Sequence, residues 1–115
     1  MIKAEIYYDE DGIFIGFKVQ DHSKPIVCAA VSALVFSTLN GIMTHTSQDV
    51  NICVGNNCVE FAVVGERNRD AGLLLDVLLE GLEQISIEYP DAIRVVKING
   101  NNNGTNEQQG IPQAV

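Results

Sequence analysis

The sequence predicts an α+β domain in which a mixed sheet carries two helices, in the order ββαββαβ, followed by a disordered C-terminal tail. Two short turn signals each separate two runs rich in β-forming residues, and two longer stretches have the apolar spacing of amphipathic helices. Because the strands come in hairpin pairs, both helices are expected on one face of the sheet. We assign the domain to residues 1–98 and the tail, dominated by Asn, Gln and Gly, to residues 99–115.

Five runs of the sequence have the composition and alternation of β-strands. The first two are joined by a D-E-D-G turn at residues 9–12, and the third and fourth by G-N-N at residues 55–57, so each pair is expected to form a hairpin. A final run follows the second helix. The predicted strands cover residues 2–8, 13–20, 50–54, 58–64 and 92–98.

Two helices are predicted between these strands. The first runs from about residue 27 to 44, with Pro25 near its start, where a missing N–H is tolerated. The second begins at a cap formed by Asp70 and runs to about Tyr89, where Pro90 ends it. The buried stripes are expected to hold Val27, Val31, Leu34, Val35, Thr38 and Ile42 in the first helix and Leu74, Val77, Leu78, Leu82 and Ile85 in the second.

Charge and composition narrow the range of partners. The formal net charge of −8 repels phosphate backbones and anionic membranes, so no direct contact with nucleic acid or membrane is expected. The same charge could favour a basic peptide or protein, or it could simply keep the protein soluble. No export signal is apparent, no apolar run reaches the roughly 18 residues of a membrane span, and the three cysteines are an odd number. These features predict reduced thiols and a cytoplasmic location.

Cys28 is the residue best placed for chemistry, at the predicted first or second position of the first helix. Free N–H groups and the helix dipole at that end favour the thiolate, which is the form of cysteine that attacks carbonyl carbons. His22, six residues earlier, could take the proton of the thiol and later return it to a leaving amine. Spacing alone leaves the simpler alternatives open, a cysteine that packs in the core and a solvated loop histidine.

The other two cysteines, Cys53 and Cys58, flank the second turn and could face each other as a redox pair, form half of a zinc site, or be inert. Zinc needs about four ligands, and His45 is the only other obvious candidate, so no metal is expected. The sequence contains no phosphate-binding glycine motif and no G-x-S-x-G motif.

The run I-V-C-A-A-V-S-A-L, at residues 26–34, resembles the nucleophile segment of the ribosomal-processing cysteine proteases, the Prp family. The opening M-I-K-A-E-I-Y, the D-E-D-G turn and the strand G-F-K-V that leads to a histidine are also similar, as is I-E-Y-P-D-A-I-R-V at residues 87–95. The resemblance includes the ββαββαβ order and covers residues 1–98.

The resemblance implies a cytoplasmic bacterial endopeptidase, homodimeric and without a cofactor, that removes a short N-terminal extension from a large-subunit ribosomal protein. It maps the nucleophile onto Cys28, the histidine onto His22 and a further serine onto Ser32, one helical turn past the cysteine. In this hypothesis His22 acts as general base and then as acid, and backbone N–H groups around Cys28 and Ala29 stabilise the oxyanion. No residue is assigned to orient His22, since Asp21 is too close in sequence to be assumed.

The sequence departs from that family around the connection between His22 and Cys28. Asp21 stands where family members typically have glycine, and Pro25 where they typically have an acidic residue. The connection, residues 23–27, is about half the usual length of a segment that covers the site in the family. The alternative function is therefore a non-catalytic ribosome-associated or peptide-binding module on the same fold, and a purely structural homodimer is a third hypothesis.

Overall fold

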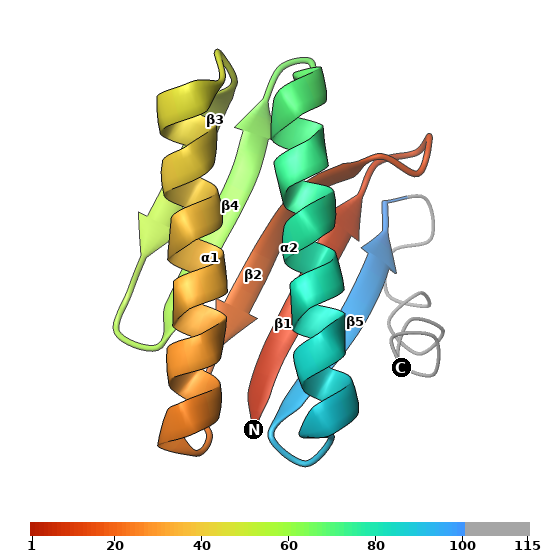
Figure 1. Cartoon of the computed structure of the whole chain (residues 1–115). Helices are drawn as coiled ribbons and strands as arrows, with labels where there is room; N and C mark the ends of the chain where they lie inside the picture. The colour runs from red at the N-terminus through yellow and green to blue at the C-terminus, as the bar shows by residue number, and fades with distance from the viewer. Residues whose placement is uncertain (101–115) are drawn as a thin grey trace.

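The computed structural model describes residues 1–100, which form one layer of sheet and one layer of helix (Figure 1). The element order is the predicted ββαββαβ, and the α+β class is confirmed. The last strand ends at Asn99, one residue later than predicted, and residues 101–115 of the predicted tail lie outside the described residues. The elements are β1 (Ile2–Tyr8), β2 (Phe14–Gln20), α1 (Pro25–His45), β3 (Asp49–Val54), β4 (Cys58–Val64), α2 (Arg69–Glu88) and β5 (Ile93–Asn99).

The sheet has the strand order β3-β4-β2-β1-β5. β1 runs parallel to β5 and the other neighbouring strands are antiparallel, so the sheet is mixed, as predicted. Helix α1 connects β2 to β3, and helix α2 connects β4 to β5. The two strands of each such pair run in the same direction, and a connection between strands of the same direction has to cross the sheet. Both helices lie on the same face (Figure 1), and among residues 1–100 the other face of the sheet carries no helix.

Phe17 of β2 occupies the centre of the core between sheet and helices. It is fully buried, it lies opposite Ile6 of β1 and Phe61 of β4, and its ring stacks on that of Phe61 with the centroids 5.2 Å apart. Such burial contributes about 1.5–3 kcal/mol for each large apolar side chain. The buried apolar side chains of the helices are Val27, Val31, Val35, Leu39 and Ile42 in α1 and Ala71, Leu75, Leu78 and Leu82 in α2.

The buried side of α2 differs in part from the predicted stripe. Val77 was predicted to be buried but is 54% exposed, whereas Ala71 and Leu75 are fully buried. The helix is apolar on several sides, so spacing alone permits more than one stripe. Packing against α1 determines which side of α2 is buried. Leu34 of α1 contacts Gly81 of α2 so closely that a Cβ atom at position 81 would lie 2.8 Å from the leucine side chain.

Both helices begin before the predicted residue. α1 begins at Pro25, which occupies the first helical position. α2 begins at Arg69 and is capped by Asn68, whose side-chain oxygen accepts hydrogen bonds from the N–H groups of Asp70 and Ala71 at 2.8 and 3.1 Å. Asp70 is therefore not the cap. Asn and Asp are equally good capping residues, so the sequence alone does not show whether Asn68 or Asp70 caps the helix.

α1 is long and apolar enough to cross a membrane by length and composition, although the sequence prediction found no such run. Its polar residues are mostly Ser, Thr and Asn, which interrupt the apolar pattern without adding an acidic or basic charge. One side of α1 is buried in the core that it shares with the sheet and α2. The core helix of a soluble protein passes the same test, so this property of α1 is weak evidence for a membrane span.

Gln48 connects three segments at one end of the sheet. Its side chain is 9% exposed, and Nε2 donates to the carbonyl oxygens of Asp49, Val64 and Glu66 at 3.0, 3.3 and 3.4 Å. Oε1 accepts a hydrogen bond from the N–H of Asn68 at 2.6 Å. These contacts join the start of β3, the end of β4 and the cap of α2.

We expect Gln48→Met, which keeps the side-chain volume, to lower the free energy of unfolding by about 2–3 kcal/mol because it leaves buried backbone groups unpaired. The matched control Gln84→Met, on the exposed side of α2, is expected to change it by less than about 0.5 kcal/mol. Urea denaturation followed by circular dichroism measures both values. Equal stability of the two variants would show that the Gln48 contacts do not stabilise the fold.

Candidate active site

The end of β2 and the start of α1 are joined by four residues, 21–24. Asp21 has a φ of 74°, in the left-handed region that suits glycine and that aspartate tolerates better than most residues. The N–H of Asp21 donates to the carbonyl oxygen of Asn57 at 2.9 Å, which fastens the end of β2 to the β3–β4 turn. His22, the next residue, is exposed.

Cys28 is the fourth residue of α1, and not the first or second as predicted, because the helix begins at Pro25. Its N–H donates to the carbonyl oxygen of Lys24 at 3.0 Å. The N–H of Ala29 lies within the regular helix, where it points to the carbonyl oxygen of Pro25 four residues earlier. The two N–H groups that the sequence predicted as oxyanion donors are thus engaged by the helix itself.

The Cys28 sulfur is held by the connection that precedes the helix. The N–H of Ser23 donates to Sγ at 3.3 Å, and the thiol donates to the carbonyl oxygen of Ser23 at 3.4 Å. A hydrogen bond from a backbone N–H to the sulfur stabilises the thiolate. This contact with Ser23 is the largest cause of the lowered pKa of the Cys28 thiol, and the contact with His22 is the next largest.

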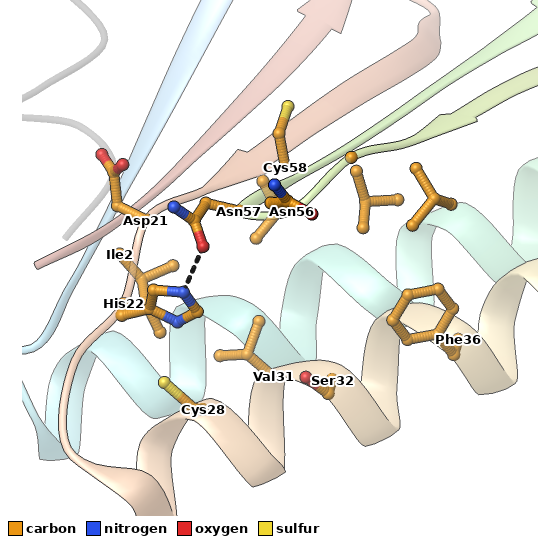
Figure 2. A pocket seen from close by; sticks show the side chains of 14 residues that line it. Ile2, Asp21, His22, Cys28, Val31, Ser32, Phe36, Asn56, Asn57 and Cys58 are labelled. Atoms are coloured by element: carbon orange, nitrogen blue, oxygen red, sulfur yellow. Dashed lines mark hydrogen bonds between the residues drawn. The ribbon is translucent and has the colours of Figure 1, made fainter.

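The His22 ring lies between Cys28 and Asn57 (Figure 2). Its Nε2 is 2.5 Å from Oδ1 of Asn57, and its other nitrogen is on the side of Cys28. The hydrogen bond with Cys28 and then that with Asn57 raise the pKa of His22, and the charge of Asp21 adds to the effect. A lowered cysteine pKa beside a raised histidine pKa favours a thiolate–imidazolium pair.

These side chains line an open pocket of about 210 Å³ between the start of α1, the end of β2 and the β3–β4 turn (Figure 2). Ser32 lies in the pocket one helical turn past Cys28, as predicted, and it is exposed. Ala29 is exposed but is not part of the lining. Phe36 lies further along α1, away from His22 (Figure 2), and Val54 of β3 is a second apolar residue of the lining.

Cys53 and Cys58 do not pair with each other across their hairpin. The register places Cys53 opposite Glu60 and Cys58 opposite Gln20, and both cysteines are free thiols. Figure 2 shows the Cys58 sulfur directed away from His22. Within residues 1–100, no group of three or more histidine, cysteine, aspartate or glutamate side chains is placed to hold a metal ion.

Two contributors to the site were missed by sequence reasoning, Ser23 and Asn57. Ser23 acts through its backbone, which leaves no signal in the type of side chain. Asn57 lies 35 residues from His22 and reaches it because β4 pairs with β2, with Cys58 opposite Gln20. The G-N-N turn was visible in the sequence as a hairpin signal, but its position beside β2 follows from the strand order.

Comparisons with known proteins agree with this fold. The sequence profile of the family described as cysteine protease Prp matches residues 1–94. The ribosomal processing cysteine protease Prp of Staphylococcus aureus (strain Mu50 / ATCC 700699) is 30% identical over 103 residues, which cover 83% of this chain and 97% of that protein. The Bacillus subtilis (strain 168) protein of the same name is 26% identical over 107 residues, covering 83% and 96%.

Solved structures are similar as well. The essential ribosomal processing protease Prp of S. aureus, in complex with a covalently linked product peptide, has a TM-score of 0.81 at 29% identity and covers 85% of this chain and 100% of its own. The S. aureus protease in complex with a substrate peptide has a TM-score of 0.80 at 27% identity, with the same coverage. Profile, sequence identity and fold agree with the resemblance seen in the sequence, and the chain belongs to the cysteine protease Prp family.

Proposed function

We propose that this protein is a cysteine endopeptidase that removes the N-terminal extension of a large-subunit ribosomal protein, with Cys28 as nucleophile and His22 as general base and then acid. The observation that carries the proposal is the pocket that the two side chains share, in which the cysteine pKa is lowered and the histidine pKa is raised. A thiolate beside an imidazolium supplies the nucleophile and the proton donor that a cysteine protease uses for acyl transfer from a peptide.

The reaction proceeds through a thioester on Cys28. The thiol gives its proton to His22, and the thiolate attacks the scissile carbonyl carbon to form a tetrahedral oxyanion. The C–N bond then breaks as His22 returns the proton to the leaving amine, and the acyl group stays on Sγ. A water molecule that gives a proton to His22 attacks the thioester, and release of the carboxyl product restores the thiol.

Ser32 is proposed as a supporting residue for the oxyanion or the bound peptide. Its exposed hydroxyl lines the pocket one turn past Cys28 and can donate a hydrogen bond there. The N–H groups of Cys28 and Ala29 act through the positive end of the α1 dipole, since their hydrogen bonds are already made within the helix.

Two observations support a basic ribosomal-protein segment as the substrate. The relatives are named ribosomal processing cysteine proteases, and structures of the S. aureus relative hold a substrate peptide and a covalently linked product peptide. The net charge of −8 attracts a Lys- and Arg-rich segment. Homodimerisation, the cytoplasmic location and the lack of contact with nucleic acid stay predictions from the sequence and the resemblance.

The alternative is a peptide-binding module on the same fold that does not catalyse cleavage. The observation that favours it is the length of the connection between His22 and α1, which consists of Ser23 and Lys24 alone. The remaining residues of the predicted connection, 25–27, belong to the helix. Two residues are too few to form a cover over a bound peptide.

We expect the wild-type protein to cleave a peptide spanning the N-terminal extension of the same organism's ribosomal protein. Cys28→Ala removes the nucleophile and is expected to lower kcat/KM by at least about 1,000-fold. Cys53→Ala, an exposed cysteine outside the pocket, is the matched control and is expected to keep the wild-type rate. Mass spectrometry identifies the cleaved bond. If the wild-type protein binds the peptide and leaves it intact, the alternative function is correct.

We also expect iodoacetamide to alkylate Cys28 faster than Cys53 or Cys58 near neutral pH, because its lowered pKa leaves more of it as thiolate. Since His22 contributes to that lowering, His22→Ala is expected to raise the Cys28 pKa, so that alkylation of Cys28 at the same pH slows. Mass spectrometry of the labelled peptides over a pH series gives each rate. Equal, slow labelling of the three cysteines would contradict an activated Cys28.

A further inference from the structure

Asn57 makes two separate contacts with the segment that carries the histidine. Its carbonyl oxygen accepts the hydrogen bond from the N–H of Asp21, and its side-chain oxygen lies 2.5 Å from Nε2 of His22. The first contact holds the backbone next to His22, and the second holds the ring itself (Figure 2). Both come from a turn of the β3–β4 hairpin and not from the elements that carry Cys28 and His22.

The side-chain contact decides which ring nitrogen carries the proton. An amide oxygen accepts hydrogen bonds and cannot donate them, so Nε2 must carry the hydrogen in this pair. A neutral imidazole has a single N–H, and the other nitrogen, Nδ1, is then free to accept a proton. Nδ1 is the nitrogen on the side of Cys28 (Figure 2).

We propose that Asn57 is the positioning residue of this site: its side-chain oxygen keeps Nε2 of His22 protonated, so that Nδ1 faces Cys28 as the proton acceptor. The catalytic part of this inference rests on the protease function proposed above. A nucleophile, a histidine and a third group that orients the histidine form an arrangement that recurs on unrelated folds, with asparagine as the third group in one of its cysteine versions.

Asp21 is the other candidate for this role, because its charge also raises the pKa of His22. Its contribution is the last of those that act on the histidine, after the hydrogen bonds with Cys28 and Asn57. Figure 2 shows its carboxylate directed away from the His22 ring. Asp21 therefore contributes to the field around the histidine, while Asn57 determines the orientation of the ring.

The first test reads the tautomer of His22 directly and does not depend on activity. The chain has two histidines, so ¹⁵N-histidine labelling gives two ring systems, and His45→Gln assigns them. In a Cys28→Ala background, where no thiolate holds the ring in its charged form, we expect neutral His22 to carry its proton on Nε2. Adding Asn57→Ala is expected to give a mixture of tautomers. An unchanged tautomer in that variant, or a proton on Nδ1 in its parent, would overturn the proposal.

The second test measures peptide cleavage. Asn57→Ala is expected to lower kcat by about 100-fold, with KM nearly unchanged, because the base is no longer held in line with the thiol. Asn57→Asp restores an acceptor for Nε2–H and is expected to recover most of the rate. Asn51→Ala, in β3 of the same hairpin and outside the pocket, is the matched control and is expected to keep the wild-type rate.

The pH profile separates positioning from a merely structural role. The alkaline limb of kcat/KM reports the loss of the imidazolium proton of His22. The hydrogen bond with Asn57 raises the pKa of His22, so Asn57→Ala is expected to move this limb to lower pH. The negative charge of Asn57→Asp moves that limb to higher pH. A limb that stays in place in both variants would overturn the proposal. Thermal unfolding checks the fold, which both variants should keep because the backbone bond to Asp21 remains.

The two tests also separate this proposal from the protease function. If Asn57→Ala changes the tautomer but neither the wild-type protein nor any variant cleaves the peptide, the positioning role is supported and the proposed protease function is overturned. If the wild-type protein cleaves the peptide and Asn57→Ala behaves like Asn51→Ala in rate and tautomer, the positioning role is overturned and the protease function stands.

Discussion

The short path from the sheet to α1 is the constraint on which the rest of the site depends. Four residues lead from one layer to the other, and the first of them, Asp21, turns through the left-handed region and bonds to Asn57. His22 is therefore held at the end of the sheet, and Ser23 is held against the Cys28 sulfur. The thiolate gains its stabilisation from this folded-back backbone, while the nearby helix N–H groups bond within the helix.

The hydrophobic core also determines the geometry of the site. Phe17 and Phe61 stack across β2 and β4, and this packing keeps the two strands in one register. The same register places Cys58 opposite Gln20, which brings the turn that contains Asn57 to the end of β2. A slip by one residue would turn the phenylalanines out of the core and move the amide away from His22. Stability and site geometry therefore depend on the same strand pairing.

The pocket is open because the connection between His22 and α1 is short. Ser23 and Lys24 are the two residues that separate His22 from α1. Two structures of the similar S. aureus protease hold a peptide. In the proposed function a peptide is held by the walls of the pocket, with Ser32 one turn past Cys28 and the apolar side chain of Phe36 further along α1. In that proposal the acidic net charge of the chain attracts a basic segment but does not position it.

The sequence by itself determined the order of elements and the two hairpins, and it made Cys28 and His22 the candidate pair, because each depends on residues close together in the chain. Tertiary structure decided the rest. Asn57 joins His22 across 35 residues only through strand pairing, and the choice of buried residues in α2, where Val77 is exposed, depends on packing against α1. Because α1 begins at Pro25, the N–H groups near Cys28 already make hydrogen bonds to carbonyl oxygens of the preceding turn. Periodicity and turn signals report local preference, whereas register and helix packing are set by contacts between distant segments.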